Sequence, residues 1–342
     1  MLKSLLERLF AWFKTAAGLT ILISIILAVA ATLDAGPYIL VNTVVTGGML
    51  GLVAMGLALV FGVMNIPQFA HGEYFMIGTL VAYYVFKPIE SFLTQNPNDT
   101  LALVAPLIGI FSAMLIGALV GALTERLVFY QLRKRNRENW VMNSFLLTVG
   151  LGVIMINGHQ LIFGTEFKGI IRYWSGAPIM VMDVFISRDR VFALVLSIII
   201  ITLFWIFMRT SRTGRAIRAV SQDETGALMV GIDLNAVQVL TMSLSCALAA
   251  VAGASLLFMY PSYPTVGLEP LYMAWFVVIL VGLGNIPGAL VGGFMVALLK
   301  VITVEYIGAG WDFVIPSALI ILVLIFKPSG IFGSEVRGVL EQ

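Results

Sequence analysis

Long apolar runs separated by short polar stretches occupy most of the chain. A helix needs roughly 17 to 25 residues to cross a hydrocarbon core about 30 Å thick, and ten runs reach or approach that length. The pattern therefore predicts an all-α polytopic membrane protein with about ten transmembrane helices, or eight if the two shortest runs, 271–284 and 313–327, do not cross. The other predicted spans are 16–33, 39–63, 74–90, 101–123, 143–163, 191–208, 237–260 and 288–306.

Composition excludes a soluble domain. Hydrophobic residues make up 60% of the 342 residues and charged residues 11%, whereas soluble domains carry about 25% charged residues. The net charge is +2, and the basic residues are divided among several loops, so no nucleic-acid partner is expected. The one cysteine, Cys246, lies in an apolar run, where it has no intrachain disulfide partner and is expected to be a small buried residue.

The basic residues of the short loops predict the orientation, because Lys and Arg in such loops stay on the cytoplasmic side. With ten crossings, the N-terminal arm, the loops after the fourth and sixth spans and the C-terminal end all fall on one side, so both termini are expected inside. The polar stretch 164–190 is expected to be an extracytoplasmic loop. The basic residues that set this orientation are Lys3, Arg8, Lys14, Arg126, Arg133, Lys134, Arg135, Arg137, Arg209, Arg212, Arg215, Arg218, Lys327 and Arg337.

The chain divides into three parts in this interpretation. Residues 1–37 form a basic arm and the first transmembrane helix, 38–334 form one transmembrane domain with a cytoplasmic loop at 209–236, and 335–342 form a cytoplasmic tail. A second interpretation is open for the N-terminus, since basic residues, an apolar run and Ala28-Val29-Ala30 are typical of a cleavable secretory signal. Cleavage would leave nine spans and the same topology downstream.

One six-residue phrase, Gly-x-x-Asn-Ile-Pro, occurs twice, at 62–67 and at 282–287, and interrupts an apolar stretch each time. Backbone breaks at membrane depth survive only against protein or a water-filled cavity, so the phrases indicate a transmembrane path. In each phrase the Asn is expected to cap a helix start and the Pro to occupy its first turn. The shift of 220 residues favours an internal parallel repeat with broken helices, although chance Gly and Pro punctuation is the alternative.

The first phrase continues into a polar stretch that contains His71 and Glu73. Ionisable groups near the membrane core are costly and indicate function; the alternative is a short cytoplasmic loop whose polar residues meet water. The other histidine, His159, lies in a different span. Two histidines and one carboxylate without ligand spacing do not make a metal motif, so no metal site is expected.

The cytoplasmic loop 209–236 has a second pattern. Its arginines recur every three residues, as the orientation rule alone explains. The stretch from Ser221 to Gly231 adds a short amphipathic helix, with Asp223 and Glu224 at its first turn and Gly231 at its end. Ala227, Leu228 and Val230 form its apolar face. Such an element indicates a docking site for a cytoplasmic partner.

Five segments together resemble the LivH-type permeases of branched-chain amino acid ABC importers. They are residues 56–63, 69–73, 209–232, 284–289 and 326–333, in the same order and with similar spacing as in that family. The likeness covers about residues 38 to 334, and the first 35 residues are an addition to the usual pattern. At Asn65-Ile66-Pro67 the family more usually has an apolar pair before the Asn.

The resemblance implies an inner-membrane transport subunit that pairs with a LivM-like second permease, two cytoplasmic ABC ATPases and an extracytoplasmic substrate-binding protein. The chain contains no phosphate-binding loop of the G-x-x-x-x-G-K-[S/T] type, so it is expected to be neither an ATPase nor another enzyme, and no cofactor is expected. Residues 222–232 would be the coupling helix, with Arg212, Arg215, Arg218, Asp223, Glu224, Gly226, Ala227 and Gly231 as coupling residues. The substrate path would follow Asn65, Gln68, Phe69, His71, Gly72, Glu73, Gly284, Asn285, Pro287 and Gly288, where broken helices present backbone dipoles to a zwitterion.

Three alternatives stay open at this point. A urea or short-chain amide permease of the same superfamily has nearly the same motifs. A channel or secondary transporter is suggested by the doubled Asn-x-Pro phrase, but a proton-coupled carrier needs intramembrane carboxylates, and besides Glu73 only Asp34, Glu305 and Asp312 lie near spans. An intramembrane hydrolase lacks a G-x-S-x-G or H-E-x-x-H phrase.

Overall fold

The computed structural model describes residues 16–135 and 140–333. Each of the ten predicted spans is helical in it, which confirms the all-α class. The basic N-terminal arm and the C-terminal tail lie outside the described residues. The helices are α2 (Ala16–Ala35), α3 (Tyr38–Met64), α4 (His71–Gln95), α5 (Asp99–Thr124), α6 (Tyr130–Arg135), α7 (Trp140–Phe163), α8 (Arg188–Thr210), α9 (Arg212–Gln222), α10 (Glu224–Met229), α11 (Leu234–Ser255), α12 (Leu268–Val281), α13 (Ile286–Tyr306) and α14 (Val314–Phe326).

Eight helical segments of the described chain are long and apolar enough to cross a membrane. The two others among the predicted spans are α4, which is long enough at 25 residues but more polar, and α12, which has only 14 residues. Large apolar side chains such as Leu33, Ile154 and Leu161 are exposed on α2 and α7, as expected for surfaces that face lipid. The structure is that of a multi-pass membrane protein.

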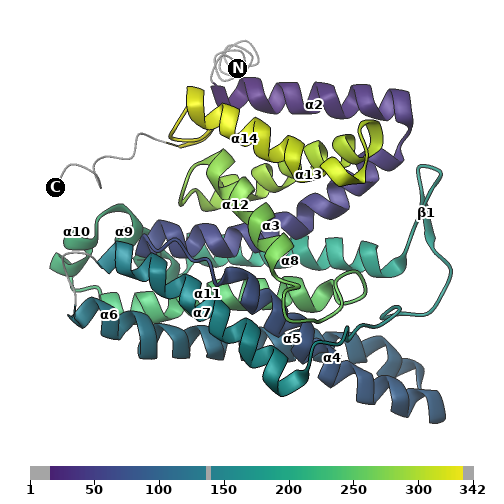
Figure 1. Cartoon of the computed structure of the whole chain (residues 1–342), viewed down its shortest axis with the longest axis horizontal. Coiled ribbons are helices and arrows are strands. Elements are labelled where there is room, and N and C mark those ends of the chain that lie inside the picture. The colour runs from purple at the N-terminus through teal and green to yellow at the C-terminus, as the bar shows by residue number, and fades with distance from the viewer. Residues whose placement is uncertain (1–15, 136–139, 334–342) are drawn as a thin grey trace.

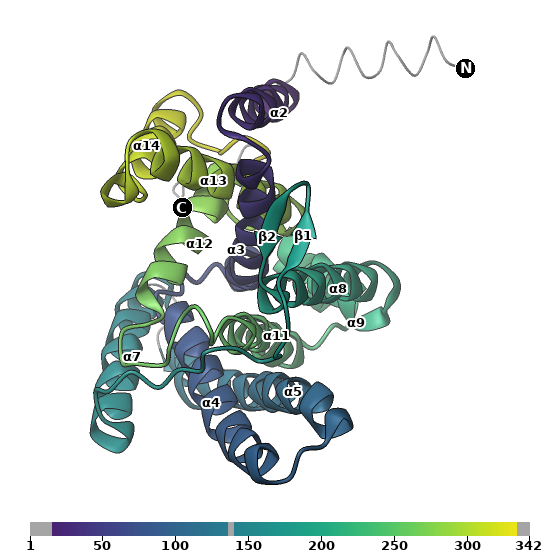
Figure 2. The ribbon, with the colours of Figure 1, turned by 90° about the vertical axis from the view of Figure 1, so that its right-hand side faces the viewer.

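Helix α3 forms the centre of the molecule. Figure 2 shows it between a group formed by α4, α5 and α11 and a group formed by α2, α13 and α14. Glycines let its backbone approach α13: a Cβ on Gly293 would lie 2.8 Å from the Gly51 Cα, and one on Gly47 would lie 2.9 Å from the Phe294 Cα. Small residues at helix contacts are the usual means of close packing in membranes, and they hold α13 antiparallel against α3.

Two connections differ from the sequence prediction. The basic stretch after the fourth span was expected to be a loop, but α5 continues through a π-helical turn (Glu125–Phe129) into α6 and remains helical to Arg135. The buried Glu125 carboxylate pairs with Arg133 across this turn, which favours the helical extension. The polar stretch 164–190 contains an antiparallel hairpin of β1 (Ile179–Val181) and β2 (Val184–Ile186), both labelled in Figure 2. The two residues of the hairpin turn, Met182 and Asp183, have positive φ, as two-residue hairpin turns of this type require.

The two copies of the repeated phrase adopt different local structures. Asn285 caps the start of α13, where its Oδ1 accepts a hydrogen bond from the Gly288 N–H at 2.9 Å, with Pro287 in the first turn. This confirms the predicted cap. Asn65 instead ends α3 in the left-handed conformation, with φ of 52°, and α4 begins only at His71. The predicted cap at Asn65 was wrong, because the apolar run keeps α3 helical as far as Met64.

Candidate translocation site

The two breaks in the helices meet at a pair of glycines. A Cβ on Gly62 would lie 2.9 Å from the Gly284 Cα, and one on Gly284 would lie 2.7 Å from the Gly62 Cα. Gly284 also has a φ of +80°, a conformation that side chains disfavour. The end of α3 therefore touches the link between α12 and α13 backbone to backbone.

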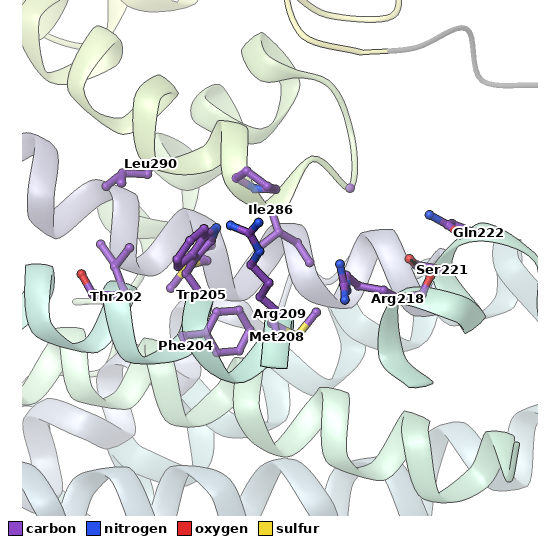
Figure 3. Close-up of a pocket in the computed structure, with 14 residues that line it drawn as sticks. Thr202, Phe204, Trp205, Met208, Arg209, Arg218, Ser221, Gln222, Ile286 and Leu290 are labelled. Atoms are coloured by element: carbon purple, nitrogen blue, oxygen red, sulfur yellow. Dashed lines mark hydrogen bonds between the residues drawn. The ribbon is translucent and has the colours of Figure 1, made fainter. Parts of the chain in front are cut away.

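A cavity of about 690 Å³ lies beside this contact, between α3, α8, α9 and α13. Figure 3 shows Trp205 and Arg209 of α8 pointing toward Ile286 at the start of α13. The Arg209 guanidinium lies 5.2 Å from the centre of the Trp205 ring, a cation–π distance. The lining of the cavity is mainly apolar with a few polar groups, as is usual for a small-molecule site. It comprises Met55, Ile201, Thr202, Phe204, Trp205, Met208, Arg209, Arg218, Ser221, Gln222, Gly284, Ile286, Pro287 and Leu290.

One wall of this cavity belongs to helix α9. Arg218, Ser221 and Gln222 of α9 line it together with Gly284 and Pro287 of the break before α13. Asn285 links the same break to the segment after α14, since its Nδ2 donates a hydrogen bond to the Phe332 carbonyl at 3.2 Å. A displacement of α9 would therefore change the shape of the cavity directly.

The first predicted path segment is not a solvated loop. Gln68, His71, Gly72 and Glu73 are buried, so the alternative of polar residues that merely meet water was wrong. The His71 Nε2 lies 3.1 Å from the Val53 carbonyl oxygen. The Glu73 carboxylate lies against α7, and its Oε2 has no hydrogen-bond partner among the described residues. A buried acid without a partner costs free energy, which favours a functional reason for its presence.

Phe69 and Pro67 lie at a different cavity from Gly284 and Pro287. The Phe69 ring stacks on Trp275 of α12 with centroids 5.0 Å apart. The Thr148 hydroxyl of α7 accepts a hydrogen bond from the Phe69 N–H at 3.3 Å, and its proton is shared between the Phe145 carbonyl of its own helix at 2.8 Å and the Pro67 carbonyl at 3.1 Å. Pro67 and Phe69 border an apolar groove of about 450 Å³ between α3, α7 and α12. The structure thus joins the two breaks through glycines, but the neighbouring residues of each break line separate cavities. Asn65 is exposed and lines neither cavity.

Sequence reasoning did not find Trp205 and Trp275 of these cavities or the Thr148 hydroxyl beside Pro67. All three lie in apolar runs, where no local spacing distinguishes them from other span residues. Their place follows from the packing of α7, α8 and α12 around α3.

Three of the arginines, Arg212, Arg215 and Arg218, lie on helix α9, which the sequence analysis did not predict. Ser211 caps α9 by accepting a hydrogen bond from the Gly214 N–H at 2.8 Å. Ile217 and Val220 are buried, while Arg212, Arg215 and Arg218 are exposed. None of the three makes an ion pair with another residue of the described chain. They are free to meet an acidic partner.

A second, shorter helix follows, and it confirms part of the predicted amphipathic helix. Helix α10 spans Glu224–Met229, begins after Asp223, and the chain turns at Gly231 with a φ of +81°. Ala227 faces the protein, but Leu228, Met229 and Val230 are 53%, 84% and 76% exposed. Consecutive exposed apolar residues at the end of a polar segment indicate a contact with another protein.

The described part of the chain thus combines long apolar helices, two helix breaks that meet at a glycine pair, and an exposed segment at α9 and α10. This architecture is that of a multi-pass membrane protein. The model of one protein family, described as branched-chain amino acid transport system / permease component, matches residues 39–324. The chain belongs to this family.

Curated relatives cover most of the chain. The high-affinity branched-chain amino acid transport system permease protein LivH of Salmonella typhimurium is 29% identical over 297 residues, which is 85% of this chain and 94% of LivH. The corresponding permease protein BraD of Pseudomonas aeruginosa is 28% identical over 299 residues, or 86% of this chain and 94% of BraD. Among solved structures, a chain of PsaBC from Streptococcus pneumoniae in complex with Fab shows a weak likeness, with a TM-score of 0.41, 15% identity and coverage of 87% of this chain and 96% of that one.

Proposed function

We propose that this chain is the permease subunit of an ABC importer that carries branched-chain amino acids delivered by a substrate-binding protein. The observation that carries the proposal is the family match over residues 39–324. It is supported by relatives that are branched-chain amino acid permeases and that align with this chain over 94% of their own length. The energy would come from separate ATPase subunits.

The cytoplasmic segment α9–α10 is the proposed ATPase contact. Leu228, Met229 and Val230 would insert into an apolar cleft of the ATPase, and Arg212 and Arg215 would pair with acidic residues around it. Asp223, Glu224, Gly226, Ala227 and Gly231 hold the shape of this segment in the proposal. Because α9 lines the 690 Å³ cavity, closure of the ATPases would move a wall of that cavity, a switch of the alternating-access type.

The substrate path in this proposal passes the two breaks. Gly284, Asn285, Pro287 and Gly288 form its inner part beside the large cavity, and Asn65, Gln68, Phe69, His71, Gly72 and Glu73 form the part between α3, α4 and α12. A path must release what it admits, so weak binding is expected along it. Specificity would rest mainly with the binding protein, and a LivM-like permease would complete the path.

Co-purification tests this proposal. The tagged chain is extracted from its native membrane in a mild detergent, beside a known ABC importer as control, and the bound proteins are identified by mass spectrometry. We expect a second permease and one or two ATPases to co-purify. Recovery of the chain alone or as a homo-oligomer, while the control importer stays intact, would contradict the proposal and favour a channel or carrier.

A further inference from the structure

A third and smaller cavity lies near the opposite end of α3 and α13. It has a volume of about 160 Å³ and lies between α3, α4, α12, α13 and the segment that follows α11. Lys300, near the C-terminal end of α13, lines it, whereas Ile286 at the N-terminal end of the same helix lines the 690 Å³ cavity. In the orientation predicted from the basic residues, this cavity lies in the extracytoplasmic half.

The walls of this outer cavity combine apolar side chains with one carboxylate and one ammonium group. Met49, Val53, Phe75 and Met273 are buried apolar residues of the wall. Glu269 at the start of α12 and Lys300 are its charged residues. The composition matches an α-amino acid with an apolar side chain, because such a molecule needs one anionic contact, one cationic contact and an apolar surface.

The charges of the outer cavity are not balanced. The Lys300 Nζ lies 2.7 Å from the Glu269 Oε1 and 3.3 Å from the Asp312 Oδ2, so two carboxylates share one ammonium group. The Tyr260 hydroxyl donates to the Glu269 Oε1 at 3.4 Å. Burial, with Glu269 nearby, raises the pKa of the Tyr260 phenol, so this hydroxyl stays protonated. Because Lys300 keeps Asp312 as a second partner, Glu269 can exchange its contact with Lys300 for one with a ligand ammonium group.

Both charged side chains of the cavity are partly exposed. The side chains of Glu269 and Lys300 are 38% and 17% exposed. Lys300 lies on a membrane-spanning helix, where a charge is costly and indicates function. An ion pair that served only to join α12 and α13 would not require an adjoining cavity with apolar walls.

We propose that the outer cavity is an entry subsite for a zwitterionic amino acid with an apolar side chain. The ligand ammonium group would bind Glu269, its carboxylate would bind Lys300, and its side chain would contact Met49, Val53, Phe75 and Met273. Asp312 would keep Lys300 in position when the ligand ammonium group replaces Lys300 as the partner of Glu269. This subsite rests on the proposed function, for which it supplies a first binding position inside the permease.

The subsite connects to the buried polar segment below it. Val53 lines the outer cavity, and its carbonyl oxygen is the atom that lies 3.1 Å from the His71 Nε2. Phe75, one turn after His71 on α4, lines the cavity as well. His71 is therefore separated from the outer cavity by the Val53 backbone and one turn of α4.

A double variant separates a ligand site from a structural ion pair. Removing one partner leaves a charge unpaired and risks the fold, whereas removing both Glu269 and Lys300 with residues of similar shape leaves neither of them unpaired. Asp312 loses its contact with Lys300 in this variant, but its side chain is 24% exposed. The importer with Glu269→Gln/Lys300→Met is purified with its partners, reconstituted in vesicles and supplied with leucine-loaded binding protein and ATP. We expect normal assembly and leucine uptake at least about tenfold slower, the effect of losing hydrogen bonds to charged groups. Glu305→Gln, which removes an exposed carboxylate on the same helix outside the cavity, should leave uptake unchanged.

Direct binding gives the second readout. In saturation-transfer NMR on the complex without binding protein, leucine should give a signal that the double variant lacks, while 3-methylbutylamine and 4-methylpentanoate, each with one charged group, should give weaker signals. Wild-type uptake and binding in the double variant would overturn the subsite alone. If the wild-type importer takes up no branched-chain amino acid at all, the proposed function fails and the subsite fails with it.

Discussion

Gly62 of α3 and Gly284 of the link between α12 and α13 lie in backbone contact, with each Cα under 3 Å from the position that a Cβ on the other would take. The contact brings together two helix breaks from distant parts of the chain and places them beside the largest cavity that we describe. Neither position has room for a side chain.

Gly284→Ala should therefore destabilise the protein. The new methyl group meets the Gly62 backbone, and the φ of +80° is strained for alanine, so a loss of about 1–3 kcal/mol is expected. Thermal unfolding in detergent measures it. Gly150→Ala, in a helix where nothing lies within 4 Å of the added atom, should be neutral or slightly stabilising. Equal effects of the two substitutions would mean that the glycine contact carries no packing constraint.

Met229→Asp tests the docking surface of α10. Met229 is 84% exposed, so the substitution should leave the fold intact, but a carboxylate in an apolar interface costs binding free energy. We expect less ATPase to co-purify and uptake to fall at least about tenfold. Thr165→Asp, exposed in the polar stretch 164–190, is the control for an added charge away from this segment. Unchanged co-purification in Met229→Asp would place the ATPase contact elsewhere.

Glu73→Gln tests the buried polar segment. Glu73 makes no ion pair within the described chain, so a neutral amide of the same shape should keep the unfolding temperature or raise it. Uptake should nevertheless fall several-fold, on the order of 1 kcal/mol in the transport barrier, because the carboxylate contributes to the path. Full uptake with normal stability would assign Glu73 no role in transport.

Thr148→Val removes the hydroxyl that holds the link before α4. The Pro67 carbonyl and the Phe69 N–H lose their contact at 3.1 and 3.3 Å, at a cost of about 1 kcal/mol. The expected result is a lower unfolding temperature together with slower uptake. In Thr210→Val the lost hydroxyl bonds only its own helix at an exposed position, so both quantities should stay close to wild type. A Thr148→Val protein with wild-type stability would show that other contacts fix the link.

The spans could be predicted from the sequence because each apolar run encodes its own helix. Asn285 could be predicted as a cap for the same local reason. The same phrase gave a wrong prediction of a helix start at Asn65. Whether an Asn ends or starts a helix depends on how far the preceding helix continues. Helix α9 was missed because its arginines indicated a loop, although Gly214, Ile217 and Val220 repeat at helical spacing and are buried together.

The chemistry of the cavities depends on contacts that no local pattern contains. Glu269, Lys300 and Asp312 come from three separate segments, and only packing brings their charges together. The burial of Gln68 and His71 likewise depends on neighbours from other helices. Sequence reasoning placed these polar residues near the membrane but could not say which cavity each would reach.

ATP-driven uptake in a reconstituted system tests the central claim most directly. The chain is assembled in vesicles with the partners that co-purify with it, loaded binding protein is placed outside and ATP inside, and labelled leucine, isoleucine, valine and urea are compared. We expect uptake of the branched-chain amino acids that requires both ATP and binding protein. Uptake of urea in their place, or leucine flux that continues without ATP, would contradict the account.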